Sequence, residues 1–248
     1  MIFRSVFLIT ALIFASAAQS APCKNDRFED ISFTVCEVDA STQQIGLFLD
    51  DAEGQKYGHF SRLDSALIAG GQQLGFAMNA GMYHEDRSPV GHYVENGQER
   101  RRVIKGASAG NFGLLPNGIF CVRKGRADVF ETNRYLREKP DCRHATQSGP
   151  MLVIDGKLHP RFLADSDSRH IRNGVGTSAD GRRAVFVISN RAVNFHTFAR
   201  YFRDRHGLPN ALFFDGSVSR LYAPNLDRSD FGFLSMGPII GLVETRKD

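Results

Sequence analysis

The amino-acid sequence predicts one α+β domain, with a mixed, largely antiparallel sheet core and a few packed helices. Short apolar runs of strand length recur along the chain, and Asn-Gly or Asp-Gly pairs lie between some of them, at 96–97, 117–118, 155–156 and 180–181. Such pairs are typical of tight hairpins, because both residues tolerate a positive φ. Two segments with helical signals complete the α+β pattern. The 248 residues, 42% hydrophobic and 23% charged, suit a single globular domain.

The first 21 residues have the pattern of a cleaved secretory signal peptide. Arg4 is the lone charge of this segment, a short apolar run covers residues 6–14, and small residues dominate positions 15–21. The apolar run is shorter than the roughly 20 residues that a membrane-spanning helix needs. We therefore expect a leader over 1–21 and a domain over 22–248 that is periplasmic or secreted, with no stable membrane insertion after cleavage.

Four cysteines remain after the expected leader, which indicates disulfide bonds in an exported chain. Of the three possible pairings, we favour Cys23–Cys36 and Cys121–Cys142, because each closes a short local loop. A zinc site is disfavoured, since the sequence contains no C-x-x-C spacing.

Strands are expected where apolar runs lie around the turn pairs: 31–38, 45–49, 74–78, 119–123, 151–154, 184–188 and 211–214. One helix is expected over 61–70. A second begins at Asn194, a residue type suited to the N-cap, and ends at Gly207 with Pro209 beyond it. Apolar residues follow helical spacing in this second segment, at Phe195, Phe198, Ala199 and Phe202.

Two short motifs resemble known catalytic patterns without their structural context. Residues 106–110 match G-x-S-x-G around Ser108, but loop or strand residues follow where a nucleophile elbow needs a helix. Residues 174–179 match G-x-G-x-x-A, but Asp180-Gly181 and a strand follow, which disfavours a dinucleotide site. The eight histidines lack the spacing of a metal site, so we expect no metal ligands, although a divalent cation stays open.

Three predicted strands end in small or polar residues, within 76–83, 145–150 and 212–219. Such ends let the backbone approach a ligand and direct polar side chains into a cleft. Asp215 follows Phe213 and Phe214 directly, so we expect partial desolvation of its carboxylate and a functional role. A plain turn aspartate is the alternative. The segment 170–176 adds Arg172, which suits bidentate binding of phosphate or carboxylate, beside two glycines.

These segments together resemble the phosphodiester glycosidase family, which includes the lysosomal uncovering enzyme. Residues 79–83 match its Asn-Gly-Gly-Phe-Phe-like motif, 148–152 its Ser-Gly-Pro-x-Leu segment, 172–176 its Arg-Thr-Ala-Ile-Gly-like motif and 214–219 its Leu-Asp-Gly-Gly-Gly-Ser motif. The matches follow the family's order over about 74–245. The sequence departs from the family at Ala80, Ser217 and Val218, so the lysosomal enzyme's substrate is not carried over.

The resemblance implies an enzyme that hydrolyses a sugar-1-phosphodiester between the anomeric carbon and the phosphate oxygen. A phosphate monoester is a stable anionic leaving group that needs electrostatic stabilisation, for which we choose Arg172. Asp215 is our choice for the catalytic carboxylate, and Glu85 or Asp86 for a second one. Asn79 also belongs to the predicted catalytic set. The predicted substrate-binding set is Ser148, Gly149, Asn173, Gly174, Gly216 and Ser219, with Asn111 and Asn194 as neighbours.

Two other functions remain open on the sequence. One is a non-catalytic binding module for anionic envelope glycans, which would keep Arg172 and the glycine-rich segments without needing Asp215. The other is a metal-dependent phosphodiesterase that cleaves the P–O bond, which needs clustered carboxylates or histidines. The expected partner in each case is a small-molecule or glycan phosphodiester. Nucleic acid is not expected, because the net charge of +4 falls only to +3 without Arg4 and forms no basic stripe.

Overall fold

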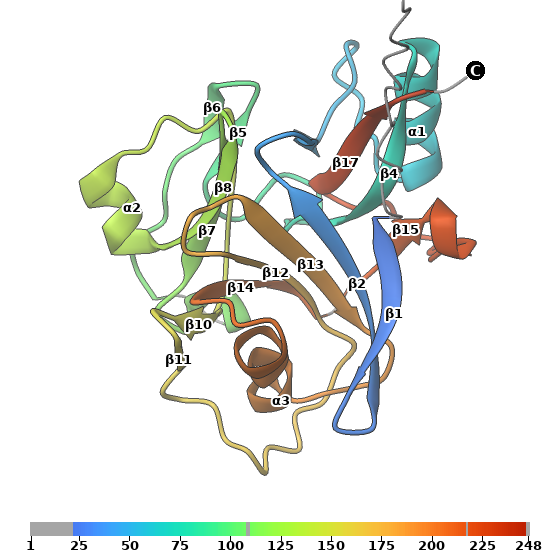
Figure 1. Ribbon diagram of the computed structural model, residues 1–248. Coiled ribbons are helices and arrows are strands. Elements are labelled where there is room, and N and C mark those ends of the chain that lie inside the picture. The colour runs from blue at the N-terminus through green and yellow to red at the C-terminus, as the bar shows by residue number, and fades with distance from the viewer. Residues whose placement is uncertain (1–21, 108–109, 217, 247–248) are drawn as a thin grey trace, which may run out of the picture.

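The computed structural model describes residues 22–107, 110–216 and 218–246; the expected leader, Ser108 and Ser217 lie outside this part of the chain. Within it, the strands form one sheet of seven and two of five, and three short α-helices pack against them (Figure 1). Every pairing between the named strands is antiparallel. The predicted α+β class with a largely antiparallel core is confirmed.

Each sheet combines strands from distant parts of the chain, and the spatial order of its strands is as follows. The first sheet contains β1 (Cys23–Phe28), β2 (Ile31–Asp39), β13 (Arg183–Ser189), β12 (Asn173–Thr177), β14 (Asn210–Asp215), β10 (Met151–Ile154) and β11 (Lys157–Leu158). The second contains β16 (Arg228–Ser229), β15 (Leu221–Ala223), β4 (Gln72–Asn79), β17 (Ile239–Thr245) and β3 (Gln44–Phe48). The third contains β6 (Gln98–Arg101), β5 (Tyr93–Glu95), β9 (His144–Ser148), β7 (Gly118–Arg123) and β8 (Arg126–Glu131).

One hydrophobic core is shared by all three sheets. It includes Phe76 of β4, Phe120 of β7 and Phe186 of β13. The ring centroid of Phe186 lies 5.2 Å from that of Phe76 and 5.7 Å from that of Phe120. Because successive strand residues point to opposite faces, β14 sends Leu212 and Phe214 into this core and Ala211 and Phe213 to the other face. The alternation determines whether the side chain of a β14 residue lies in the shared core or on the opposite face of the sheet.

The three helices cover the outer faces of the sheets. The first, α1 (Phe60–Ala69), packs on β4, and α2 (Thr132–Glu138) packs beside β7 and β8. The third, α3 (Phe195–Arg200), continues into the π-helical turn η2 (Tyr201–Arg205) and covers the far face of the first sheet (Figure 1). No helix in the described ranges is long and apolar enough to cross a membrane.

Most of the predicted element ends lie within two residues of the ends seen in the structure. All seven predicted strands are present, and so are both predicted helices, the second with the unpredicted π turn at its end. Asn194 caps α3 as expected, its Oδ1 accepting a hydrogen bond from Thr197 N–H at 2.9 Å. The helix α2 was not predicted, because Glu131 caps it in place of the usual Ser, Thr, Asp or Asn.

Two of the four predicted turn pairs form two-residue hairpins, at Asn96-Gly97 and Asp155-Gly156, with positive φ at both residues. Asp180-Gly181 lies in a longer hairpin loop between β12 and β13. The hairpin expected at Asn117-Gly118 is wrong. Gly118 begins β7 and the buried Asn117 side chain instead bonds to Phe112 O and Thr132 Oγ1.

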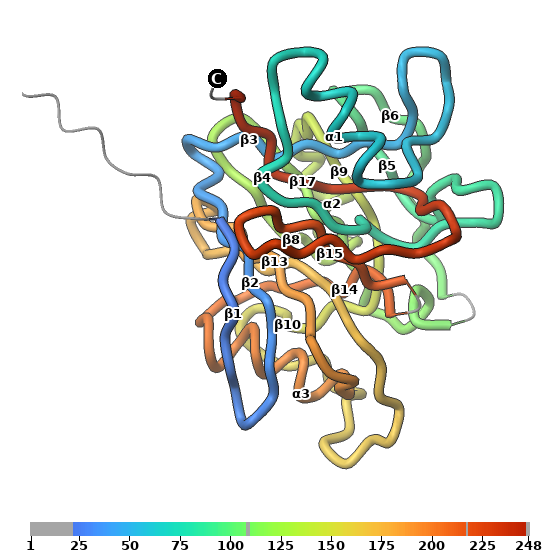
Figure 2. Tube along the Cα trace, turned by 90° about the vertical axis from the view of Figure 1, so that its right-hand side faces the viewer, coloured from blue at the N-terminus to red at the C-terminus, as the bar shows by residue number. Residues whose placement is uncertain are grey.

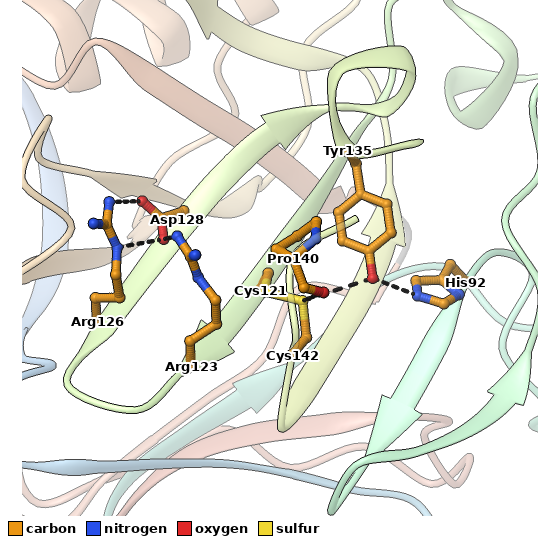
Figure 3. The surroundings of a disulfide bond; sticks show 8 residues. All are labelled: His92, Cys121, Arg123, Arg126, Asp128, Tyr135, Pro140 and Cys142. Carbon is orange, nitrogen blue, oxygen red and sulfur yellow. Dashed lines mark hydrogen bonds and ion pairs between the residues drawn. A yellow bond between two sulfur atoms is a disulfide. The ribbon is translucent and has the colours of Figure 1, made fainter. Parts of the chain in front are cut away.

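Both predicted disulfides are present. Cys23–Cys36 joins β1 to β2, and Cys121–Cys142 joins β7 to the segment before β9. Figure 3 shows the second bond beside Tyr135, whose hydroxyl oxygen lies 2.9 Å from His92 Nε2 and 3.6 Å from Cys142 Sγ. The disulfide therefore sits in a cluster of buried side chains between the third sheet and α2.

Candidate functional site

One strand end from each sheet converges on the candidate site. Asn79 ends β4 of the second sheet, Ser148 ends β9 of the third and Asp215 ends β14 of the first. Asn173, which begins β12, pairs with Asp215 because the two strands are antiparallel. All four residues are at most 9% exposed. The three strand ends that the sequence singled out are thus brought together by packing of the sheets around a common core.

The buried amides of Asn79 and Asn173 organise this junction. Asn173 Nδ2 donates to Asn79 O and to Asn79 Oδ1, both at 3.0 Å. Asn173 Oδ1 accepts from Asp215 N–H at 3.2 Å and lies 3.3 Å from Ser219 Oγ, while Asn79 Oδ1 also accepts from Arg220 N–H at 3.0 Å. Asn79 Nδ2 is buried and has no hydrogen-bond partner among the described residues. One amide donor of the network is therefore unused.

A β-bulge aligns Asp215 with Asn173. Gly174 pairs with Phe213 and Asn173 pairs with Asp215, so Phe214 is the extra residue of β14. Its carbonyl oxygen accepts a hydrogen bond from Ser148 Oγ at 2.7 Å, which ties β9 to the bulge. Bulges change the direction of the residue that follows and recur next to active sites. Here the bulge determines where the Asp215 side chain leaves the sheet.

Arg172 is a buried cation beside this junction. Its side chain is 1% exposed, and its guanidinium carbon lies 3.6 Å from the centroid of the Phe195 ring. Nε donates to Val193 O at 2.9 Å and Nη2 to Ser168 O at 3.1 Å, but Nη1 is buried without a partner in the described chain. Burial lowers the pKa of Arg172 to about 10, so the group stays charged at neutral pH.

Gly216 lies directly against the Arg172 guanidinium. A Cβ at Gly216 would stand 3.6 Å from Nη1, and 3.2 Å from Phe213 Cζ. The cation therefore lies next to the backbone that follows Asp215. Since Arg172 forms no ion pair with any described residue, its charge is available to an anion held near that backbone.

Tyr83 lies near Asp215, and Arg87 and Arg220 lie near Tyr83. Burial and, next, the negative charge of Asp215 raise the pKa of the Tyr83 phenol, whereas the charges of Arg87 and Arg220 act in the opposite direction. The Arg87 guanidinium carbon lies 5.5 Å from the centroid of the Tyr83 ring. The site thus combines a carboxylate and a protonated phenol with two cations that are less buried than Arg172.

The sequence prediction assigned no role to these three residues. Tyr83 closes the 79–83 motif and Arg220 follows Ser219 directly, so the signal for both was adjacency to predicted site residues. Arg87 was not singled out, although it lies only four residues from Tyr83 in the same loop. Its Nε also donates to Ser235 Oγ, which is 148 positions away, at 2.9 Å.

The predicted glycines occupy close contacts between strands. A Cβ at Gly174 would lie 2.5 Å from Leu212 O of β14, and one at Gly149 would lie 2.7 Å from Asn117 Cβ. Ser219 Oγ donates its one hydrogen to Asp215 O at 2.5 Å, and Ile171 O and Asn173 Oδ1 are alternative acceptors at 3.1 and 3.3 Å. These residues hold the backbone of the junction together.

The remaining predicted residues lie in loops and caps. Glu85 and Asp86 are exposed in a turn, where Ser88 donates to Asp86 Oδ1 from its hydroxyl at 2.6 Å and from its amide at 2.9 Å, lowering the pKa of Asp86. Asn111 is exposed at the start of the 3₁₀ turn Asn111–Gly113. Asn194 is buried, and its Nδ2 donates to Ala164 O and Ser166 O, so its amide anchors the loop before β12.

Potential metal ligands do not gather within residues 22–107, 110–216 and 218–246: no group of three or more His, Cys, Asp or Glu side chains there could hold an ion.

Comparison with known proteins places this geometry in context. The sequence model of one family, described as phosphodiester glycosidase, matches residues 72–231, a segment that contains Asn79, Ser148, Arg172 and Asp215. An uncharacterized protein of Escherichia coli (strain K12), YigE, is 32% identical over 221 residues, which cover 88% of this chain and 85% of that protein.

Among solved structures, the fold is similar to the catalytic domain of zebrafish N-acetylglucosamine-1-phosphodiester alpha-N-acetylglucosaminidase, auto-inhibited by its pro-peptide. The TM-score is 0.61, and the match covers 89% of this chain and 81% of that one. The sequence identity is 13%, so this likeness concerns the fold.

Proposed function

Because the chain belongs to the phosphodiester glycosidase family, we propose that it hydrolyses a sugar-1-phosphodiester of the cell envelope at the bond between the anomeric carbon and the phosphate oxygen. Water adds across this bond: its hydroxyl group goes to the anomeric carbon and its proton to the solvent or the phosphate. The products are a free sugar and a phosphate monoester. The two disulfides support export, since such bonds persist in oxidising compartments.

The observation that carries the proposal is the presence of two unused buried donors at the junction where Asp215 ends β14. The Asp215 carboxylate follows a bulge at a junction that also holds Asn79 Nδ2 and Arg172 Nη1, both buried without a partner among the described residues. Buried donors are normally satisfied, so two unused ones near the end of β14 favour a ligand with acceptor oxygens. A sugar-1-phosphodiester presents such oxygens on its hydroxyl and phosphate groups.

The charges of the side chains at the site determine the role proposed for each of them. Asp215 stabilises the oxocarbenium-like anomeric centre, attacks it or activates water. Arg172 lies beneath the Asp215–Gly216 backbone and stabilises the negative charge of the departing phosphate monoester, helped by Arg87 and Arg220 from the less buried side. Tyr83 stays protonated and donates to a phosphate oxygen.

Other predicted residues at the junction are proposed to contact the substrate or to position the groups that do. Asn79, Ser148 and Ser219 orient the substrate, and Asn173 holds Asn79 relative to Asp215. The backbone at Gly149, Gly174 and Gly216 shapes the binding surface.

The proposal is tested by release of phosphate monoester from synthetic sugar-1-phosphodiesters. Asp215→Asn should lower kcat at least about a hundredfold, as removal of a catalytic carboxylate does. Asp180→Asn is the matched control, because Asp180 also precedes a glycine, at an exposed hairpin turn. Arg172→Met, which keeps most of the side-chain volume without the charge, should lower kcat similarly while circular dichroism shows a folded protein. Full activity in folded Asp215→Asn and Arg172→Met variants would refute the site.

Oxygen-18 water separates the proposal from cleavage of the P–O bond. Label in the sugar supports the glycosidase, and label in the phosphate supports a phosphodiesterase, for which activity should also disappear with EDTA. Binding of the substrate without any product supports the binding module. Glu85→Gln and Asp86→Asn test for a second carboxylate, since the variant of the residue that serves as one should lose activity.

A further inference from the structure

Three large apolar side chains are exposed within four consecutive residues beyond β16. Phe231 is 76% exposed, Phe233 94% and Leu234 70%. The two phenylalanine rings contact each other edge to face, with centroids 5.4 Å apart. Soluble proteins rarely expose adjacent large apolar groups unless the surface binds something. We name residues 231–234 the aromatic loop.

The aromatic loop is held at both ends by hydrogen bonds. Before it, Asp230 N–H donates to Leu221 O at 2.9 Å and Asp230 Oδ2 accepts from Leu221 N–H at 2.9 Å. After it, Met236 N–H donates to Gly58 O at 2.7 Å, and Ser235 Oγ accepts from Arg87. Figure 2 shows this stretch, in red, running beside the 83–90 loop. The exposed rings therefore stand on a fixed backbone.

Arg220 connects the aromatic loop to the candidate site. Its backbone N–H donates to Asn79 Oδ1 at 3.0 Å, while its Nη1 donates to Leu234 O at 2.9 Å. The guanidinium packs against Gly232 so closely that a Cβ there would lie 1.9 Å from Nη2. One residue thus contacts both the Asn79 amide and the loop, which places the loop next to the phosphate-binding part of the proposed site.

A cavity of about 390 Å³ lies between the aromatic loop and the start of α1. Its apolar walls come from Phe60, Phe231, Phe233 and Met236. Its charged lining residues are Arg220 and Asp230, and the Asp230 carboxylate forms an ion pair with Arg228 at 2.8 Å. Volume and lining suit an apolar group attached to an anion. Phe233 and Leu234 lie beyond residues 72–231, the segment that matches the family.

We infer that this cavity and the aromatic loop bind an apolar chain carried by the phosphate of the substrate. The inference rests on the proposed function: the sugar binds at Asp215, the phosphate lies near Arg220 and the chain extends over Phe231 and Phe233. Continuity through Arg220 favours this occupant over an unrelated partner. The substrate is then a sugar-1-phosphodiester with an alkyl, acyl-bearing or prenyl group on the far side of the phosphate, and the product is the corresponding phosphate monoester.

Direct binding can be measured because the chain contains no tryptophan. Phe233→Trp places a single fluorophore on the loop, and Leu163→Trp is the matched control on another exposed loop, where Leu163 is 66% exposed. Decyl phosphate below its micellar concentration should shift the emission of the Phe233→Trp variant to the blue in a saturable manner, and inorganic phosphate should not. No shift, or an equal shift in both variants, overturns the inference. A shift that depends on protein concentration without ligand identifies a second copy as the occupant and also overturns it.

Kinetics provide the second test. The ratio of kcat/KM for decyl against methyl sugar-1-phosphodiesters should be at least about tenfold in the natural chain. It should fall close to one in Phe231→Ser/Phe233→Ser and stay high in Leu163→Ser. A ratio near one in the natural chain, or a preference for a sugar in place of decyl, contradicts the inference. If no phosphodiester is hydrolysed, the proposed function is wrong. The fluorescence measurement of decyl phosphate binding to the Phe233→Trp variant then still tests whether the aromatic loop binds an apolar chain attached to a phosphate.

Discussion

Asn173 Nδ2 donates to Asn79 Oδ1 across 3.0 Å, and this contact joins two sheets through residues 94 positions apart. Asn173 Oδ1 also accepts a hydrogen bond from the Asp215 backbone N–H. The Asn173 side chain therefore positions the strand ends at both Asn79 and Asp215. An amide is suited to this position because its nitrogen donates while its oxygen accepts. An ionised carboxylate of the same size would have no hydrogen to donate to Asn79.

Asn173→Ala should therefore lower activity as well as stability. The variant leaves the Asp215 amide and Asn79 without their buried partner, which costs about 1–3 kcal/mol of unfolding free energy. Loss of alignment should lower kcat at least about tenfold. Urea unfolding and phosphodiester hydrolysis measure the two effects. Asn25→Ala on β1, the edge strand of the first sheet, is the control: it removes the hydrogen bond from Thr34 Oγ1, and it should lower stability without lowering kcat. Unchanged kcat in Asn173→Ala contradicts the positioning role.

Gly174→Ala should destabilise the junction by overpacking. Its Cβ would lie 2.5 Å from Leu212 O, a backbone atom that cannot rotate away, so β12 and β14 must separate. The expected loss is about 1–3 kcal/mol of unfolding free energy. Gly106→Ala serves as control, because nothing described lies within 4 Å of its Cβ position and its φ is not positive. Thermal unfolding compares the two, and equal melting temperatures would show that the strands adapt without cost.

Seven of the named strands could be predicted from the sequence because their apolar runs have the length of a strand. Apolar residues of β2 and β14 alternate between two buried faces, and their runs need no tertiary information to be recognised. The failed hairpin at Asn117-Gly118 shows the limit. The pair tolerates a turn, but the Asn117 amide finds better partners in Phe112 O and Thr132 Oγ1, which only the fold supplies.

The candidate site was predictable as a set of strand ends, and its geometry was not. Asp215 and Asn79 stand where apolar strands stop, and that position is visible in the sequence. The bulge at Phe214 depends on pairing with β12, and the hydrogen bond from Arg87 Nε to Ser235 Oγ joins residues 148 positions apart. Neither long-range relationship leaves a local signal. The exposure of the aromatic loop likewise depends on the fold, because in the sequence its two phenylalanines are simply part of an abundant residue type.

Removal of the Cys121–Cys142 bond should destabilise the third sheet. The bond closes a segment with a separation of 21 residues, and such loops contribute about 3 kcal/mol by restricting the unfolded chain. The double variant Cys121→Ala/Cys142→Ala should lose that much in urea unfolding. Its counterpart Cys23→Ala/Cys36→Ala, with a separation of 13, should lose somewhat less. The reverse order would show that strand pairing, rather than loop length, determines each contribution.

Stability should fall as the pH drops from 6.5 towards 4, and His206 should account for part of the loss. Burial lowers the pKa of His206 to about 4, and its Nδ1 accepts from Arg183 Nη2 at 3.1 Å, so the folded protein holds the ring neutral. In the unfolded chain the ring regains a pKa of about 6.5. Between these two values the unfolded state binds a proton that the folded state does not, so acid favours unfolding by up to about 3 kcal/mol at this site.

His206→Gln removes the titrating ring and keeps an acceptor for Arg183. The variant should lose less unfolding free energy than the natural chain between pH 7 and pH 4.5, measured by urea unfolding at each pH. His144, whose pKa burial also lowers to about 4, maintains a residual slope in the variant. An identical slope in His206→Gln and the natural chain would mean that the buried ring is protonated in the folded state, with Arg183 displaced to accommodate the charge.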